Sequence, residues 1–396
     1  MAITRSRLDF SVITFSRGEV TGAIGDTVTV LPIVVALATL TPISLPHTLL
    51  AFGVFQVVWG LWYGLPMSVE PMKALAALAI AGTLSYSEFL LAGLVSGVVL
   101  LALGTGGGLA RAERAVGRPV VRGVQLAVAL VLARTGLDLA LGDPILALAG
   151  LAVAIIAIAI GRANVAALGV LGLGIGITIT LAGVPVLTVP GVPAVPLGKL
   201  VPTIGVLEGA LAQLAMTVGN AAVATSLLVA DFFDREVSPD ELSRGMGVMT
   251  LLSVSLGGVP MCHGSGGLAG KHAFGARSAG ANVVLGVLYG LAALVAGGGF
   301  FALFPMAILG VVLVLVAWEL GKSALGSESR GLAVAIGAIG AVGLLANVGI
   351  AFVCGIAGYW VLEGIREEGE NTGDENDGSD ESGADGFSRR ATDRNP

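Results

Sequence analysis

Apolar stretches separated by short groups of charged residues, proline or glycine follow one another from residue 20 to residue 363. A helix needs roughly 20 apolar residues to cross the hydrocarbon core of a bilayer. Hydrophobic residues make up 55% of the chain and charged residues 12%, with a mean hydropathy of +0.92. That leaves too little polar surface for a soluble domain of this size. The sequence therefore predicts an all-α polytopic protein of the lipid bilayer.

The apolar stretches divide into fourteen expected spanning segments. Their ranges are 20–41, 48–64, 67–84, 88–105, 121–140, 144–160, 164–182, 205–230, 245–259, 264–277, 279–298, 300–320, 331–346 and 348–363. Short cytoplasmic loops collect Lys and Arg. With the N-terminus inside, the outer loops hold only Lys199, and the inner loops hold Arg111, Arg114, Arg118, Arg122, Arg162, Arg235, Arg244, Lys271, Arg277, Lys322 and Arg330. This bias predicts a multi-pass protein of the cell membrane with both termini in the cytoplasm.

A proline-rich stretch over residues 184–204 divides the segments into two sets of seven and is expected to be an outer linker. An odd number of segments in each half inverts the second half relative to the first, as in many secondary transporters. We therefore expect a first repeat over 1–183, which includes a short cytoplasmic leader, and a second repeat over 205–363. Residues 364–396 are rich in Asp and Glu and are expected to form a disordered cytoplasmic tail.

Two short segments in matching positions of the halves indicate the transport site. The first begins at Gly64-Leu-Pro-Met and the second at Gly258-Val-Pro-Met. Interrupted helices at matching positions of inverted repeats mark binding sites, and helix N-termini attract anions. The expected substrate-binding residues are Met67, Ser68, Val69, Glu70, His263, Gly264, Ser265, Gly266 and Gly267. The alternative is that proline and glycine serve only helix packing in both segments.

Ionisable side chains within a bilayer are costly and usually functional, which makes Asp26, Glu70, Lys73 and Arg134 candidates. Glu70 and Lys73 are three residues apart on one expected helix, so a local ion pair that only neutralises the lysine is the alternative. Asp26 is the first candidate to carry a coupling proton with the anion, and Glu70 is the second.

Other polar residues are expected to support the site. Gly25 and Thr27 flank Asp26, while Gln213 and Asn220 face either the substrate or neighbouring helices. The neighbours Cys262 and His263 offer at most two metal ligands, so we expect no metal and no cofactor.

Other classes of protein are not favoured by the sequence. The chain has no nucleophile elbow, zinc motif or phosphate-binding loop, which argues against an enzyme. Basic residues are spread over the inner loops without interleaved aromatics, which argues against nucleic-acid binding. A channel is a further alternative within the membrane class.

Four stretches carry a resemblance to a known family. They are residues 66–74 (PMSVEPMKA), 262–269 (CHGSGGLA), Gly25-Asp26 before Leu31-Pro-Ile, and 274–280 (FGARSAG). Together they resemble the molybdate transporter family related to the SulP sulfate permeases. The resemblance implies the fold of SulP and uracil-permease-like carriers, with segments 1–4 and 8–11 in a core domain and segments 5–7 and 12–14 in a gate domain. It also implies alternating access and a homodimer formed through the gate.

Two departures from the family pattern affect the expected substrate. Family members commonly have Gln where this chain has Glu70, and an added carboxylate would oppose a dianion unless Lys73 or a proton neutralised it. SulP permeases usually end in a cytoplasmic domain that this sequence lacks, which favours the molybdate branch. We therefore expect a secondary transporter of molybdate, with sulfate as the alternative and a base or carboxylate carrier after it.

Overall fold

The computed structural model describes residues 13–191, 200–297, 299–326 and 330–361, and helices occupy each of the fourteen expected ranges. The first half forms α1 (Arg17–Leu40), α2 (Leu45–Tyr63), α3 (Lys73–Ile80), α4 (Tyr86–Gly106), α5 (Leu109–Val116), α6 (Arg118–Leu141), α7 (Pro144–Ala159) and α8 (Ala166–Ala182). The second half forms α9 (Ile204–Met216), α10 (Thr225–Phe233), α11 (Pro239–Ser255), α12 (Ser265–Ala273), α13 (Gly280–Val295), α14 (Met306–Leu325), α15 (Arg330–Leu345) and a last helix, Val348–Val361.

Several of these helices fit a bilayer. Among the described residues, seven are long and apolar enough to cross a membrane by length and composition, and four shorter ones are also apolar. Five of the seven come from the first half: α1, α2, α4, α6 and Ala163–Ala182, which contains α8. The short helix α5 was not expected. Leu109 is buried at its start while Arg111 and Arg114 are exposed, so α5 shows one apolar and one charged face.

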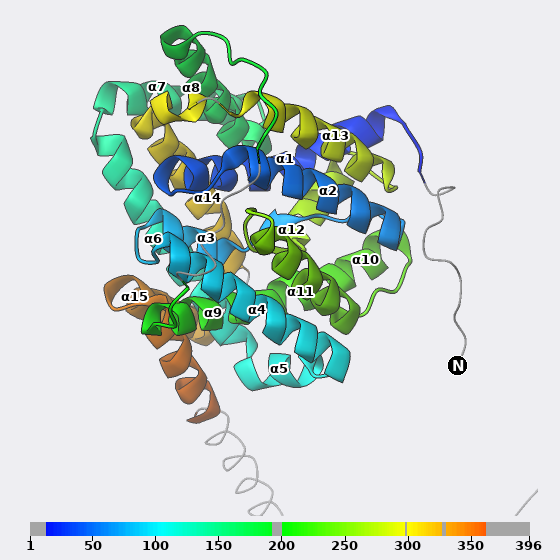
Figure 1. The fold of residues 1–396 in the computed structure, drawn as a ribbon. Helices are drawn as coiled ribbons and strands as arrows, with labels where there is room; N and C mark the ends of the chain where they lie inside the picture. The colour runs from blue at the N-terminus through cyan, green and yellow to red at the C-terminus, as the bar shows by residue number, and fades with distance from the viewer. Residues whose placement is uncertain (1–12, 192–199, 298, 327–329, 362–396) are drawn as a thin grey trace, which may run out of the picture.

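The helices pack as two groups, which we name after the expected domains. The core group consists of α1–α4 and α9–α13, where α2 packs on α13, α4 on α11, and α1 on α12. The gate group consists of α6–α8, α14, α15 and the last helix, and α6 lies at its centre against α14 and α15. In Figure 1, α6, α7 and α15 lie on one side of the molecule and α10–α12 on the other. The groups meet where α3 and α9 pack on α6 and where α1 packs on α14 and α8.

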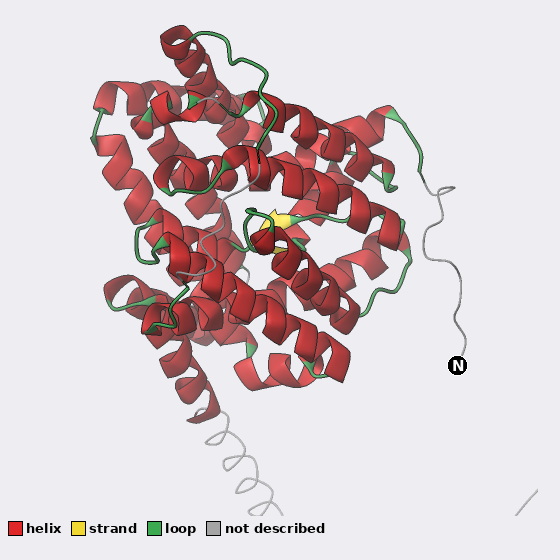
Figure 2. Cartoon of the chain, in the orientation of Figure 1, coloured by secondary structure: helices red, strands yellow, loops and turns green. Residues whose placement is uncertain are grey.

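A two-stranded antiparallel sheet joins the two halves inside the core group. Strand β1 (Glu70–Pro71) pairs with β2 (Met261–Cys262), with Glu70 opposite Cys262, and the Met72 N–H donates to the Pro260 carbonyl at 2.9 Å. Figure 2 shows these strands at the middle of the molecule. Each strand leads into a short helix, α3 or α12.

The start of α3 corrects the sequence prediction. We expected a helical segment from residue 67, but the helix begins at Lys73 because Pro71 disfavours helical backbone at the residue before it.

A close contact between two helix backbones positions the charged residues. A Cβ added to Gly25 on α1 would lie 2.7 Å from the Gly270 carbonyl oxygen of α12, so glycine is required there. With the backbones in contact, the next residue of each helix, Asp26 and Lys271, come together. Small residues permit this approach between membrane helices.

Candidate functional site

Asp26 lies at the centre of a buried polar network. Its side chain is fully buried, pairs with Lys271 at 3.2 Å, and accepts hydrogen bonds from the Ser68 hydroxyl and the Gln56 amide. Both carboxylate oxygens thus have protein partners. A buried charge is tolerated only with such compensation.

Lys271 corrects a second prediction, because we had counted it among the inner-loop cations. It is fully buried and donates to Gln56 Oε1 at 2.8 Å, to the Met67 carbonyl at 2.7 Å and to Asn282 Oδ1 at 3.0 Å. The Asn282 amide also donates to the Met67 carbonyl, at 2.7 Å. The network therefore fixes the loop before β1 to α2, α12 and α13.

Glu70 and Lys73 form a second ion pair, at 2.5 Å. Glu70 Oε1 accepts from the Gly267 N–H at 2.8 Å and from the Thr29 hydroxyl at 3.1 Å. The Glu70 side chain is fully buried, whereas that of Lys73 is 15% exposed. The local ion pair that the sequence left open is present in the structure.

An oxygen of the protein occupies each half-helix N-terminus. Gln213 Oε1 accepts from the N–H groups of Ala74 and Leu75 in α3, at 2.9 and 3.3 Å. Glu70 Oε1 accepts from Gly267 in the first turn of α12. Helix N-termini favour such acceptors because the orphan N–H groups and the helix dipole attract negative charge. The two ends thus already bind oxygen atoms.

A small cavity lies between these helix ends. It is lined by Glu70, Lys73, Gln213, Met216, Thr217, Asn220, Ala221, Cys262, His263, Gly264 and Ser265. Its volume is about 20 Å³, which is room for one or two water molecules. The Ser265 hydroxyl donates to Asn220 Oδ1 at 2.8 Å on the cavity wall. Asn220 belongs to a π-helical stretch, Thr217–Ala224, that continues α9 into α10, and such stretches are frequent at functional sites.

His263 borders both the cavity and an aromatic cluster. Its Nδ1 lies 3.0 Å from the Ser68 carbonyl, so Nδ1 carries the proton in that hydrogen bond. Its Nε2 is buried without a hydrogen-bond partner among the described residues. The rings of Trp59 and Tyr63 meet the imidazole edge-on at 5.8 and 5.6 Å.

The expected site residues fall into three sets. Glu70, Lys73, Gln213, Asn220, His263, Gly264 and Ser265 line the cavity. The buried Met67, Ser68, Val69 and Gly267 lie around the two carboxylates, and Gly25 forms the contact of α1 with α12. Thr27 and Gly266 form the third set, which neither lines the cavity nor contacts the carboxylates. The Thr27 hydroxyl donates to the Ile24 carbonyl of its own helix, and Gly266 is exposed.

The sequence analysis missed Gln56 and Asn282, which hold the Asp26 network together. Each is an amide side chain within an expected apolar segment, and this polar residue in an apolar stretch is the sequence feature that could have identified it. Within the described ranges there is no group of three His, Cys, Asp or Glu side chains placed to hold a metal ion.

The fold is similar to those of solved anion transporters. The transmembrane domain of the cyanobacterial bicarbonate transporter BicA matches with a TM-score of 0.64 and 17% identity, over 85% of this chain and 97% of that one. Murine SLC26A9, an anion transporter solved in the inward-facing state, matches with a TM-score of 0.66 and 13% identity, over 88% of this chain and 68% of that one. The chain thus shares the overall fold of these proteins.

Sequence comparison defines the family. The family model described as "Molybdate transporter of MFS superfamily" matches residues 18–132 and 205–320. Molybdate transporters 1 and 2 of Arabidopsis thaliana are 31% and 30% identical to this chain, each over 87% of it and 88% and 87% of their own lengths. Molybdate transporter 1 of Chlamydomonas reinhardtii is 28% identical over 89% of this chain and 92% of its own. The chain belongs to the molybdate transporter family and is a transporter, not an enzyme.

Proposed function

We propose that this protein is a secondary transporter of molybdate in the cell membrane and that it works by alternating access. The observation that carries the proposal is the cavity between the N-terminal ends of α3 and α12, bordered by Lys73, Ser265 and His263, in a chain of this family. Helix N-termini, hydroxyls and one ammonium group suit an oxyanion. The termini would lie in the cytoplasm.

Two inverted seven-segment repeats, 1–183 and 205–363, are part of this proposal. Helix contacts between the two halves occur in matching pairs when each helix is exchanged for the one in the equivalent segment of the other half. The contact of α2 with α13 corresponds to that of α11 with α4, and the contact of α1 with α12 corresponds to that of α9 with α3. The family model also matches stretches of nearly equal length in both halves. Both observations support a two-fold relation, with the core group moving against the gate group during transport.

Anion binding would rearrange the Glu70–Lys73 pair. A tetrahedral oxyanion is larger than the one or two waters for which the cavity has room. Lys73 is partly exposed and borders the cavity, so its ammonium group can turn from Glu70 to the anion. Ser265 and Asn220 would then contribute polar contacts on the opposite wall.

Proton coupling is assigned to Glu70 in this proposal, in place of Asp26. Asp26 does not border the cavity, and both its oxygens are bound by Ser68, Gln56 and Lys271. Glu70 borders the cavity and loses its counterion if Lys73 turns to the substrate. A proton on Glu70 would then remove the repulsion between the carboxylate and the dianion.

Calorimetric binding of molybdate, tungstate and sulfate to the purified protein tests the substrate and the site together. Ser265→Ala should weaken molybdate binding by about 1.5–3 kcal/mol, the range for a hydrogen bond to a charged group. Ser96→Ala is the control, since Ser96 lies on α4 and does not line the cavity.

Each result of the calorimetry has a defined meaning. Stronger binding of molybdate than of sulfate, weakened only by Ser265→Ala, supports the proposal. Equal binding of the three anions would favour the alternative of a general sulfate-type permease. Absence of binding by all three would overturn the oxyanion proposal, and a base or carboxylate would then be tested.

Light scattering of the purified protein tests the homodimer implied by the resemblance.

A further inference from the structure

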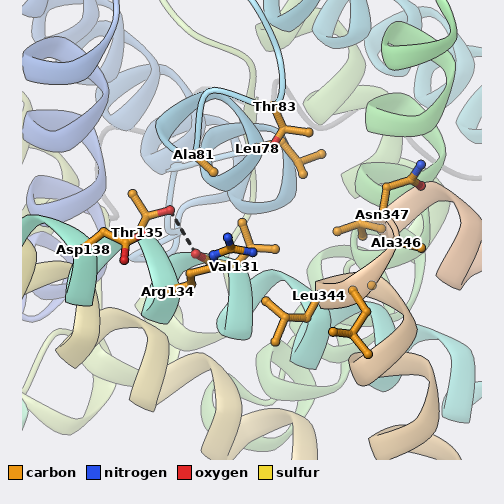
Figure 3. A pocket seen from close by; sticks show the side chains of 13 residues that line it. Leu78, Ala81, Thr83, Val131, Arg134, Thr135, Asp138, Leu344, Ala346 and Asn347 are labelled. Carbon is orange, nitrogen blue, oxygen red and sulfur yellow. Dashed lines mark hydrogen bonds between the residues drawn. The ribbon is translucent and has the colours of Figure 1, made fainter.

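A second cavity lies at the boundary of the core and gate groups, away from the half-helix ends. Its volume is about 380 Å³, and it is lined by residues of α3 and its end (Leu78, Ala81, Thr83), of α6 (Val131, Arg134, Thr135, Asp138), and of the turn after α15 (residues 343–348). Figure 3 shows the Arg134 side chain projecting between Ala81 and Leu344. The cavity is thus large enough for a hydrated anion and contains a cationic side chain.

The position of Arg134 is unusual within the charge distribution of the protein. Arg118 begins α6 at the proposed inner surface, and Arg134 lies 16 residues further along the helix, or about 24 Å at 1.5 Å per residue. The other described Lys and Arg residues lie at inner helix ends and loops, apart from Lys73 and Lys271 in the core. Arg134 is therefore the one described Lys or Arg in the proposed outer half.

Among the described residues, no ion pair neutralises the charge of Arg134. Arg134 and Asp138 line the same cavity one helical turn apart, and both are exposed. The structure shows no ion pair between them. The Thr135 hydroxyl is occupied by the Val131 carbonyl of its own helix, at 3.1 Å. The guanidinium therefore remains available to a mobile anion.

Two helices connect this cavity to the site. Lys73 at the start of α3 lines the small cavity and Leu78 lines the large one, which places them about 7–8 Å apart along the helix. On α9, Gln213 lines the small cavity, while Glu208 accepts a hydrogen bond from Asn347 beside the large one, at 2.9 Å. Buried apolar side chains, including Leu75 of α3 and Val128 of α6, lie on the packed helices between them.

We propose that this cavity is an outer vestibule in which Arg134 forms a transient binding site for the oxyanion before the core group opens to the gate group. The proposal rests on the function proposed above and adds a second anion site to it. The vestibule concentrates the anion at an otherwise acidic outer face, where Glu88, Asp143 and Glu208 lie. The field of Arg134 raises the local anion concentration and the rate of entry, and Asp138 on the same wall opposes that effect.

Uptake of labelled molybdate by cells that express the full chain tests the vestibule. Arg134→Gln should raise the apparent KM for external molybdate about 3- to 10-fold at low ionic strength and leave the maximal rate unchanged. At about 1 M salt the Debye length is roughly 3 Å, so the difference should fall below about 2-fold. Arg134→Lys should restore the wild-type KM, and Asp138→Asn, on the same wall, should lower it.

Three outcomes would overturn the proposal: an unchanged KM in Arg134→Gln, a change in KM that high salt does not reduce, or a loss confined to the maximal rate. Molybdate binding to the purified Arg134→Gln protein should equal that of the wild type at high salt, because the residues around the small cavity are intact.

A labelling experiment keeps the test independent of the proposed substrate. Thr135→Cys in a Cys354→Ser chain should react from outside with a membrane-impermeant anionic thiosulfonate faster than with a cationic one, and Arg134→Gln should remove that preference. Absence of reaction, or no preference, would refute the vestibule. A charge preference in a protein that takes up no molybdate would retain the vestibule and refute the proposed substrate.

Discussion

Two carboxylate–ammonium pairs lie within the core group, and they differ in what surrounds them. The Asp26–Lys271 pair is fully buried, and amide, hydroxyl and carbonyl groups bind both partners. The Glu70–Lys73 pair borders a cavity, and Lys73 retains some exposure. A pair enclosed by complete hydrogen bonding fixes one geometry, whereas a pair beside a cavity can exchange partners with a ligand. The difference separates a structural role from a transport role.

The largest effect is expected from removing the enclosed ammonium group. Lys271→Met leaves Asp26 as an uncompensated buried charge, which should lower the free energy of unfolding by about 3–5 kcal/mol. Thermal unfolding in detergent, monitored by size-exclusion chromatography, measures this loss of stability. Lys322→Met is the control, because Lys322 is 49% exposed in a pair with Glu319 and should contribute little. Equal stability of the two variants would contradict the structural role.

Gly267 lies where the two pairs meet. A Cβ there would overlap Asp26 Oδ1, Ser68 Oγ and Glu70 Oε1, so Gly267→Ala should cost about 1–3 kcal/mol of stability through overpacking. Gly266→Ala is the matched control, because nothing lies within 4 Å of a Cβ at that position. The same thermal measurement applies, and a cost in both variants would show that helix α12 tolerates no alanine at its start.

Lys73 should matter for binding more than for stability. Lys73→Met in a Glu70→Gln chain avoids an unpaired carboxylate and should weaken molybdate binding about 10-fold relative to Glu70→Gln alone, or ~1.4 kcal/mol. Calorimetry measures the difference. If binding is unchanged, Lys73 does not turn to the anion and the contrast between the two pairs is lost.

The smallest energetic effect, and the most specific one, concerns pH. Uptake by the wild type should rise as pH falls, because protonation of Glu70 removes its repulsion of the dianion. Glu70→Gln should bind molybdate within a few-fold of the wild type, roughly 1 kcal/mol, and lose the pH dependence. Asp26→Asn is the comparison and should keep the pH dependence while losing stability. Initial uptake rates between pH 5 and pH 8 measure it; loss of the pH dependence only in Asp26→Asn would reverse the assignment.

The sequence predicted the positions of the helices because hydropathy is a local property. It also predicted that the segments after Gly64 and Gly258 come together, as the β1–β2 pairing shows, and it left open the Glu70–Lys73 ion pair that the structure contains. It did not predict the burial of Lys271, which lies in a short helix among glycines and has the appearance of a loop cation. Its burial depends on the contact between Gly25 and Gly270, a tertiary feature without a local pattern.

The same limit applies to the capping of the two half-helix N-termini, those of α3 and α12. Sequence periodicity gave no sign that the amide of Gln213 caps α3 or that the Glu70 carboxylate caps α12. Gln213 is 139 residues from Ala74, whose N–H it accepts from, and Glu70 is 197 residues from Gly267. Only the folded chain brings them together.

The long separation across the network has a consequence for synthesis. Gln56 and Lys271 are 215 residues apart, so at about 5–20 residues per second a ribosome needs roughly 10–40 s to make the second after the first. During that interval Asp26 has been synthesised and its ammonium partner has not. The core of the first half is therefore complete only after α12 has been synthesised.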